Sequence, residues 1–267
     1  MDNSSLIRLL GFPAALIHGD TMVLDRWLWL RRRLPRPRPG ETLLDVGCGT
    51  GVFSAGAARR GYRVLGLNWD ERDQALARRR AEYCGGSEAC FEIQDIRFLS
   101  SRSDLQEGFS TVICLEVIEH LLDDLGLMRA LAGCLRPGGR LLLTTPNLEH
   151  RPVSPGDAGP FPAEEDGGHV RKGYNQDALR ELCRSAVLEP VAFSYCSGFL
   201  SQKITRLKRS LTRVSMAFGW FMVLPLRALP PILDPLLTPV LNWPWYSIGL
   251  EARKPVSPPA EKAGSTD

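Results

Sequence analysis

The sequence predicts an α/β fold: a doubly wound, mostly parallel sheet with helices on both faces. Short apolar runs alternate with helix-forming segments over residues 42–145. Strands separated by helices need crossover connections, which make the strands parallel. A glycine cluster follows the first apolar run. Ligands of such sheets bind outside the carboxyl ends of the strands, so a binding site is expected there.

Each element follows from apolar patterning and from the breakers beside it. Strands are expected at residues 42–46, 63–67, 89–93, 111–115 and 140–145, and helices at 52–60, 71–83, 121–135 and 175–186. Residues 146–168 are rich in proline and glycine, and we expect a long loop over the carboxyl edge of the sheet. A terminal strand pair is expected at 191–195 and 247–252.

Three regions are predicted along the chain. Residues 1–40 form an N-terminal arm and helix: 1–19 are expected to be loosely structured, 20–34 to be helical, and the prolines of 35–40 to end that helix. Residues 41–254 form the main domain, which includes a helical insert at 196–245. Residues 255–267, rich in Pro, Ser and Ala, are expected to be a disordered tail.

Composition excludes several classes of protein. Hydrophobic residues make up 44% of the 267 residues, too many for a disordered chain. Lys and Arg total 33 against 30 Asp and Glu, and a net charge of +3 does not mark a dedicated nucleic-acid binder. Seven cysteines without a C-x-x-C pair argue against disulfides or structural zinc. This cysteine pattern predicts a reducing, cytoplasmic location. Because the first apolar run is short and interrupted, no signal peptide is expected.

The glycine cluster reads DVGCGTG from Asp45 to Gly51. Glycines between a strand and a helix let the backbone approach a ligand closely. A dinucleotide fingerprint would need Gly or Ala at position 52, where Val52 stands, and no recognisable hydride-transfer pair is present. These two departures disfavour an NAD-dependent oxidoreductase.

Two further strand ends carry polar side chains. Asn68 and Asp70 end the second strand, about twenty residues after Gly47, where ribose hydroxyls are bound in such folds. Asp95 and Ile96 end the third strand and offer a carboxylate and an apolar contact to an adenine ring. Three such ends on one sheet edge favour a nucleoside cofactor, although each alone is also a helix N-cap candidate.

The motifs DVGCGTG, GLNWDE, QDI, CLEVIEHL and LRPGGRLLLTTPN, followed by a final strand pair, resemble a class I S-adenosylmethionine-dependent methyltransferase. Within that class, CLEVIEHL and TTPN resemble the ubiquinone-biosynthesis O-methyltransferases and their relatives. The resemblance covers residues 42–253. It implies a seven-stranded Rossmann-like sheet with an antiparallel last strand, and S-adenosyl-L-methionine as the methyl donor.

The resemblance also implies a cofactor site. Asp45, Gly47 and Gly49 would contact the methionine end, Asp95 and Ile96 the adenine, and Leu115 the pocket wall. Family members usually carry an acid where Asn68 stands, so Asp70 is the alternative ribose ligand. The full predicted set is Asp45, Gly47, Cys48, Gly49, Asn68, Asp70, Asp95, Ile96 and Leu115.

Glu116, Glu119 and His120 stand at i, i+3 and i+4, which places them on one face of a helix. Two carboxylates and an imidazole at this spacing can bind Mg²⁺, and the resemblance extends to relatives that use Glu-x-x-Glu-His in this way. His169 is the candidate for a further histidine of that arrangement. Two alternatives stay open: His169 and His120 act as general bases without a metal, or the carboxylates only favour a helix N-terminus.

The insert contains five basic residues and no acidic one over 201–213, with an apolar stripe at helical spacing. Such a helix is typical of membrane-surface or partner-binding segments. Prolines and Arg227 interrupt the apolar run that follows, so a single transmembrane span is excluded. Residues 201–245 are therefore either a cap or peripheral membrane contact, or a packed insert or dimer interface. The oligomeric state is left open.

The predicted activity is methyl transfer to an oxygen of a small amphiphilic or lipid-linked acceptor, in the cytoplasm and at the inner face of a membrane. A non-catalytic cofactor-binding scaffold is the alternative, favoured mildly by Asn68. A metal-assisted RNA 2′-O-methyltransferase is a further alternative. It is disfavoured because the basic helix lacks the interleaved aromatic residues expected for base stacking.

Overall fold

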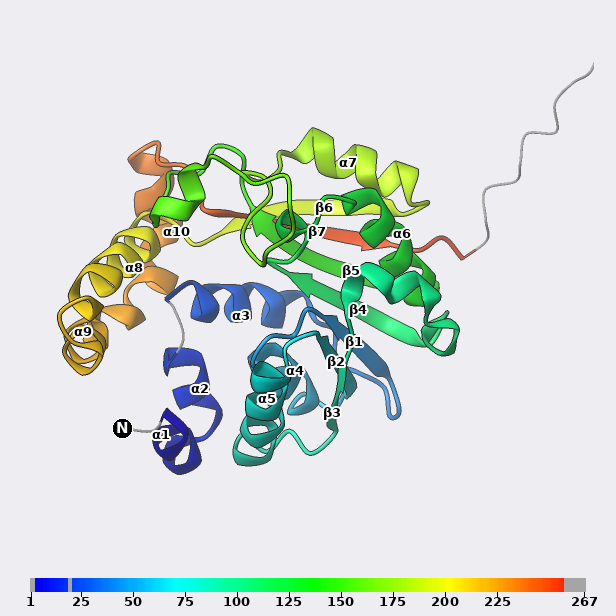
Figure 1. The fold of residues 1–267 in the computed structure, drawn as a ribbon, viewed down its shortest axis with the longest axis horizontal. Coiled ribbons are helices and arrows are strands. Elements are labelled where there is room, and N and C mark those ends of the chain that lie inside the picture. The colour runs from blue at the N-terminus through cyan, green and yellow to red at the C-terminus, as the bar shows by residue number, and fades with distance from the viewer. Residues whose placement is uncertain (1–2, 19–20, 257–267) are drawn as a thin grey trace, which may run out of the picture.

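Seven strands form one sheet in the order β3-β2-β1-β4-β5-β7-β6 in the computed structural model, which describes residues 3–18 and 21–256 (Figure 1). β7 pairs antiparallel with both β5 and β6, and the pairs among β1 to β5 are parallel. The predicted doubly wound fold with an antiparallel last strand is confirmed. The strands are β1 Thr42–Val46, β2 Arg63–Asn68, β3 Ala89–Ile93, β4 Phe109–Leu115, β5 Leu135–Pro146, β6 Glu189–Cys196 and β7 Ser247–Arg253.

Helices cover both faces of this sheet. The α-helices are α1 Asn3–Leu10, α2 Phe12–His18, α3 Thr21–Arg33, α4 Val52–Ala58, α5 Glu71–Tyr83, α6 Asp124–Cys134, α7 Gln176–Ser185, α8 Phe199–Thr212, α9 Met216–Val223 and α10 Pro230–Val240. Short 3₁₀ turns are η1 Ile96–Ser101, η2 Ser103–Leu105, η3 Ile118–His120, η4 Pro155–Ala158 and η5 Pro225–Ala228. In Figure 1, α6 and α7 lie on one side of the sheet, and α3 and α4 lie on the other.

The sheet separates two apolar cores. Val112 of β4 packs in one cluster with Leu131 of α6 and Leu179 of α7. Its neighbour Ile113 belongs to a second cluster, which contains Trp29 of α3 and residues of α4. Successive side chains of a strand point to opposite faces, so a central strand covered by helices on both sides is apolar throughout.

The expected loose arm at residues 1–19 is wrong for the part that the structure describes. α1 and α2 pack against the sheet-covering helices: Ile7, Phe12 and Leu16 are buried, and the rings of Phe12 and Trp27 are 5.0 Å apart, edge to face. Helices this short gain their stability from tertiary packing rather than from propensity. Residues 19 and 20, at the junction with the predicted helix, lie outside the described residues.

The predicted helix that was to carry Glu116, Glu119 and His120 is also absent from its expected place. Glu116 adopts a left-handed backbone conformation with φ 56°. The chain then makes only the three-residue turn η3, and α6 starts at Asp124, capped by the side chain of Asp123. A left-handed residue cannot continue a right-handed helix, so the i, i+3, i+4 face does not form.

Two connections cover the carboxyl edge of the parallel strands. One is the loop between β5 and α7, called the lid below, which spans residues 147–175; the loop was expected at 146–168, but Pro146 ends β5. Asn175 caps α7 by accepting a hydrogen bond from the backbone N–H of Ala178. The other connection holds α8, α9 and α10, called the insert below. It leaves the same edge, because Pro146 and Cys196 both pair with Ser247.

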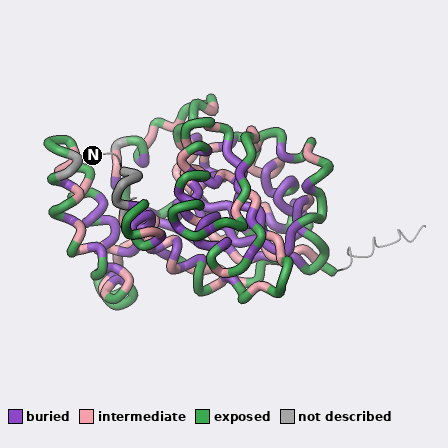
Figure 2. Tube along the Cα trace, turned by 90° about the horizontal axis from the view of Figure 1, so that it is seen from below, coloured by how far each residue is buried: buried purple, intermediate pink, exposed green. Residues whose placement is uncertain are grey.

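Burial follows this layout. Figure 2 shows the central strands largely buried, whereas the insert carries long exposed stretches. Among the described residues, no single helix is long and apolar enough to cross a membrane. Most of the predicted tail lies beyond the part of the chain that the structure describes, at residues 257–267.

Candidate active site

A cleft of about 480 Å³ opens at the carboxyl ends of β1, β2, β3 and β4, under the lid. Five of the nine predicted cofactor-binding residues line it. The lining residues are Gly47, Gly49, Asn68, Trp69, Asp95, Ile96, Arg97, Glu116, Val117, His120, Leu121, Glu165, Asp166 and Gly167. The strand ends singled out from the sequence therefore meet at one cavity, as the edge rule for parallel sheets predicts.

The glycine loop forms one wall of this cleft. The backbone N–H groups of Gly47 and Cys48 both donate to the carbonyl oxygen of Leu67, at 2.9 Å. Gly47 has φ 75°, and a Cβ there would lie 2.5 Å from Cγ2 of Val117. Only glycine meets both conditions without strain, so the loop stays close to β4 and leaves the cavity open.

The other four predicted cofactor-binding residues do not line the cleft. Asp45 is buried behind the loop and accepts a hydrogen bond from Oγ of Ser54 at 2.5 Å. Burial raises the pKa of Asp45 to about 7. Cys48 packs against α5, Asp70 caps that helix, and Leu115 is buried in the core. Asp45 and Cys48 support the loop that carries Gly47 and Gly49.

Seven lining residues were missed from the sequence, among them Trp69, Arg97 and Glu165. Trp69 follows the end of β2 directly and is 64% exposed. The backbone N–H of Trp69 donates to Oδ1 of Asn68 at 3.0 Å. Arg97 pairs with Asp95 at 2.5 Å, and this hydrogen bond lowers the pKa of Asp95. Glu165 of the lid lies 3.4 Å from the same guanidinium. The sequence signal for Trp69 was a tryptophan directly after a predicted strand end, within GLNWDE.

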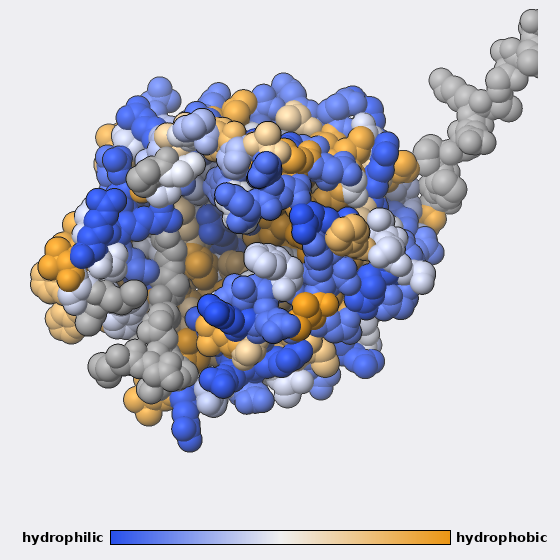
Figure 3. All heavy atoms as spheres, viewed as in Figure 1, coloured by the Kyte–Doolittle hydropathy of each residue, from blue (hydrophilic) through white to orange (hydrophobic). Residues whose placement is uncertain are grey.

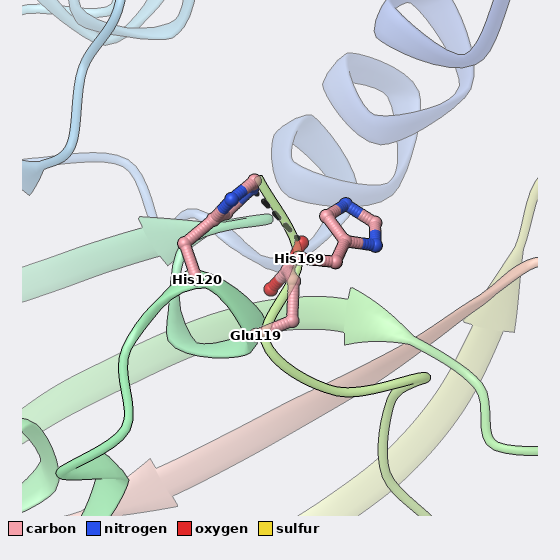
Figure 4. Close-up of side chains that lie close together, drawn as sticks. All are labelled: Glu119, His120 and His169. Atoms are coloured by element: carbon pink, nitrogen blue, oxygen red, sulfur yellow. Dashed lines mark ion pairs between the residues drawn. The ribbon is translucent and has the colours of Figure 1, made fainter. Parts of the chain in front are cut away.

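Two histidines and a buried glutamate meet at the other end of the cleft (Figure 4). The rings of His120 and His169 are 4.7 Å apart and nearly perpendicular. Oε1 of Glu119 lies 3.9 Å from Nε2 of His120. His169 comes from the lid, which is fixed here because Val170 N–H donates to the carbonyl oxygen of Glu119 at 3.0 Å.

The electrostatics of this group follow from burial. Glu119 is fully buried, and Oγ1 of Thr145 donates to its Oε2 at 3.1 Å. Burial and the nearby Glu116 raise the pKa of Glu119 well above its usual range. Burial and His120 lower the pKa of His169, which keeps that imidazole neutral. Within the described residues, Glu119 Oε1 and His169 Nδ1 have no hydrogen-bond partner.

The predicted metal set of Glu116, Glu119 and His120 is not assembled. Glu116 lines the cleft, but its Oε2 accepts from Arg26 of α3 at 2.9 Å. Among the described residues, the ligand atoms that lie within 4.8 Å of one another belong to Glu119, His120 and His169. Two imidazoles and one carboxylate are a poor set for Mg²⁺, which prefers oxygen ligands. The residues present do not fit the predicted magnesium site.

Arg171 and Tyr174, which follow His169 in the lid, both bind Asp124 at the start of α6. Arg171 pairs with the carboxylate of Asp124 and donates to the carbonyl oxygen of Leu121 at 2.6 Å. The hydroxyl of Tyr174 donates to the same carboxylate at 2.8 Å. Both residues hold the end of the lid against the start of α6, and the same part of the lid places His169 beside His120.

Comparison with known proteins agrees with this fold. A family model described as a methyltransferase domain matches residues 25–192, more than half of the chain. The chain therefore belongs to this family and is a class I S-adenosylmethionine-dependent methyltransferase. As an enzyme of this class, it is neither the oxidoreductase nor the non-catalytic scaffold considered from the sequence.

Curated relatives of the chain include ubiquinone biosynthesis O-methyltransferases. The protein of Idiomarina loihiensis is 33% identical over 177 residues, which are 61% of this chain and 70% of the relative. The protein of Methylocella silvestris is 37% identical over 116 residues, 43% of this chain and 44% of the relative. The similarity to the second relative thus spans less than half of its length.

Solved structures share the fold at low identity. Phosphoethanolamine N-methyltransferase 2 of Haemonchus contortus, in complex with S-adenosyl-L-methionine, has a TM-score of 0.62 at 15% identity, covering 96% of this chain and 60% of that one. An S-adenosylmethionine-dependent methyltransferase of Mesorhizobium loti has a TM-score of 0.55 at 21% identity, covering 89% and 99%. These likenesses support the fold alone.

Proposed function

We propose that the enzyme methylates a hydroxyl oxygen of a small amphiphilic acceptor, with His120 as the general base. The observation that carries this proposal is the position of His120 on the cleft wall, with its Nδ1 2.9 Å from the carbonyl oxygen of Gly168. A carbonyl oxygen only accepts, so Nδ1 carries the proton. Nε2 then holds a lone pair that can accept a proton from the acceptor.

The chemistry asks little else of the protein. S-adenosylmethionine supplies an activated methyl group when bound. The residues of the cleft hold and orient the two reactants: Gly47 and Gly49 through their backbone, Asn68 and Asp95 through polar side chains, and Ile96 through apolar contact. Orientation contributes up to roughly 7–11 kcal/mol to such reactions. Because a neutral hydroxyl is a weak nucleophile, proton removal by His120 is the remaining step.

The relatives support oxygen as the acceptor atom. The curated proteins at 33–37% identity are named O-methyltransferases. The apolar lining from Ile96, Val117 and Leu121 beside polar residues suits an acceptor with both characters. We place the reaction in the cytoplasm, since the seven cysteines are free thiols and such proteins are typical of reducing compartments.

The test combines binding with turnover. Calorimetric titration with S-adenosylhomocysteine measures the cofactor site, and a screen of amphiphilic phenols and alcohols then measures methyl transfer. His120→Gln is expected to lower kcat by about 10²–10⁴-fold and to change the affinity for S-adenosylhomocysteine little. Glu164→Gln, at an exposed lid residue outside the cleft lining, is the matched control. Full turnover by His120→Gln would exclude His120 as the base.

Metal-assisted methylation, including that of RNA 2′-hydroxyls, is the second candidate. The observation that favours it is the group of Glu119, His120 and His169. Such a set suits borderline ions that accept imidazole ligands. Chelation with EDTA distinguishes the two candidates: it leaves the rate unchanged if His120 acts as the base, and abolishes the rate if a metal ion is required.

A further inference from the structure

Helix α10 has its apolar and polar faces reversed. Ile232, Leu236 and Val240, four residues apart, are 68%, 65% and 80% exposed. On the opposite face, Asp234 and Thr238 are buried. A surface helix of a water-soluble protein normally turns its apolar stripe to the core and its polar stripe to water. The reversal indicates that the outward face of α10 meets something less polar than water.

Specific hydrogen bonds fix this orientation. The carboxylate of Asp234 accepts from the backbone N–H groups of Leu200, at 2.7 Å, and Ser201, at 3.2 Å. Oγ1 of Thr238 accepts from the backbone N–H of Phe199 at 3.0 Å. The polar stripe of α10 thus satisfies the free N–H groups at the start of α8. Rotating α10 to bury its apolar stripe would break all three bonds.

The neighbouring helices add a matching surface. In α9, which contains no charged residue, Phe218 and Phe221 are exposed. Beside it, α8 and its C-cap expose the basic side chains of Lys203, Arg206 and Arg213. No Asp or Glu occurs over residues 199–233. The insert therefore exposes an apolar strip on α10 and aromatic side chains on α9, and both helices pack against the basic helix α8.

Shape and position agree with an interfacial role. Residues 218–228 and 230–240 together have the length and composition of a membrane span, but they are bent by 75° at the break between them. By length and composition alone, a bent pair of this kind fits a broken span or a re-entrant loop rather than a straight span. Figure 3 shows hydrophobic side chains gathered beside hydrophilic ones at the left edge of the molecule, where α8 and α9 lie in Figure 1.

We propose that the insert docks on the surface of a lipid bilayer that contains anionic lipids. The exposed apolar side chains of α9 and α10 enter the boundary between headgroups and acyl chains, and Arg206 and Arg213 contact lipid phosphates. Charge complementarity favours a bilayer as the occupant, because basic residues without acidic neighbours match a uniformly anionic surface. Docking brings the carboxyl edge of the sheet, where the insert begins and ends, to the membrane.

The test is co-sedimentation of the full chain with vesicles of phosphatidylcholine and phosphatidylglycerol, and with vesicles of phosphatidylcholine alone. The wild type is expected to bind the mixed vesicles and to be released by salt. Ile232→Asp with Leu236→Asp is expected to weaken binding by about 10-fold or more. Arg206→Glu with Arg213→Glu is expected to weaken binding to the mixed vesicles by about 10-fold.

The matched control is Val187→Asp with Val191→Asp, two valines outside the insert that are each 56% exposed; it is expected to bind vesicles as the wild type does. Titration with S-adenosylhomocysteine checks that every variant is folded, and it also separates this proposal from the proposed activity. Failure of the wild type to bind mixed vesicles at low salt overturns the proposal. A second result also overturns the proposal: the wild type self-associates, and Ile232→Asp with Leu236→Asp abolishes this self-association but leaves vesicle binding unchanged. The apolar strip of α10 would then join two copies of the chain.

Discussion

The two ends of the cleft differ in how far apart in sequence their interacting residues lie. One end is called the cofactor end, because the sequence predicts cofactor binding by Asn68 and Asp95 there. Asp95 accepts a hydrogen bond from Arg97, two positions on, and Asn68 accepts one from the backbone N–H of the next residue, Trp69. The other end is called the acceptor end, because the proposed base His120 lies there. Arg26 donates a hydrogen bond to Glu116, 90 positions away in sequence, and His120 is hydrogen-bonded to Gly168, 48 positions away. Local motifs fix most of the first end, to which the lid adds Glu165, 3.4 Å from Arg97. The second end exists only after the lid and the N-terminal helices have packed.

The largest expected effect is at Gly47, where the two ends touch. Alanine there would place Cβ 2.5 Å from Cγ2 of Val117 and would hold a non-glycine residue at φ 75°. We expect Gly47→Ala to lower the free energy of unfolding by about 3–5 kcal/mol and to abolish measurable binding of S-adenosylhomocysteine. Urea unfolding and calorimetry measure the two effects.

Gly49→Ala is the control for that prediction. Gly49 also has a left-handed backbone, but nothing lies within 4 Å of its Cβ position. Only the backbone strain of about 1–2 kcal/mol is expected there. Equal losses in the two variants would mean that contact with Val117 plays no part, and that the two ends of the cleft are independent.

The second prediction concerns the buried acid that joins α3 to the insert. Asp25 accepts a hydrogen bond from Ser201, and burial, with a smaller contribution from Asp234, raises its pKa from 3.8 to about 7. The folded chain therefore holds a proton that the unfolded chain loses. Stability from this site is greatest below about pH 4 and falls as the pH rises to about 7.

Asp25→Asn keeps an acceptor for Ser201 and removes the ionisation. We expect it to raise the free energy of unfolding by about 2–4 kcal/mol near pH 8 and to change it little near pH 4. Urea unfolding at several pH values measures the difference, with Glu164→Gln, an exposed acid, as the control. A gain that does not depend on pH would show that Asp25 is not protonated in the fold.

Local signals explain how much of the molecule the sequence predicted. The bounds of α5 and β3 agree with expectation, because a capping Asp70 and short apolar runs mark them locally. The helices α1 and α2 were missed, since their burial depends on Trp27 and its neighbours. Glu116 was placed on a helix because spacing alone does not reveal a left-handed backbone.

The same distinction holds within the cofactor motif. Gly47 lines the cleft, whereas Asp45, two residues earlier in DVGCGTG, faces Ser54 of α4. A motif fixes which residues are near a ligand. It does not fix which side of the strand each side chain takes, because that depends on the helix packed against it. The binding roles carried over from the family stay predictions.

The third prediction tests whether the long-range ion pair matters to the acceptor end. The side chains of Arg26 and Glu116 are each 14% exposed, so breaking the pair leaves a mostly buried charge. We expect Arg26→Gln to cost about 1–3 kcal/mol of stability and to lower kcat more than it changes the affinity for S-adenosylhomocysteine. A double-mutant cycle with Glu116→Gln isolates the pair. If the effects of Arg26→Gln and Glu116→Gln on stability and kcat simply add in the double variant, the two side chains are not coupled.

The smallest effect is expected at Asn68, where the resemblance to the family fails. Asn68→Asp is expected to tighten S-adenosylhomocysteine binding by about 3–10-fold, because a carboxylate forms charge-assisted hydrogen bonds with ribose hydroxyls. The new side chain keeps an acceptor for the N–H of Trp69. Asp70→Asn is the matched variant: Asp70 caps α5 and lies outside the cleft lining, so the cofactor affinity is expected to stay unchanged. Weaker binding of S-adenosylhomocysteine after Asp70→Asn would instead assign the ribose contact to Asp70. Asp70 would then both cap α5 and bind the cofactor.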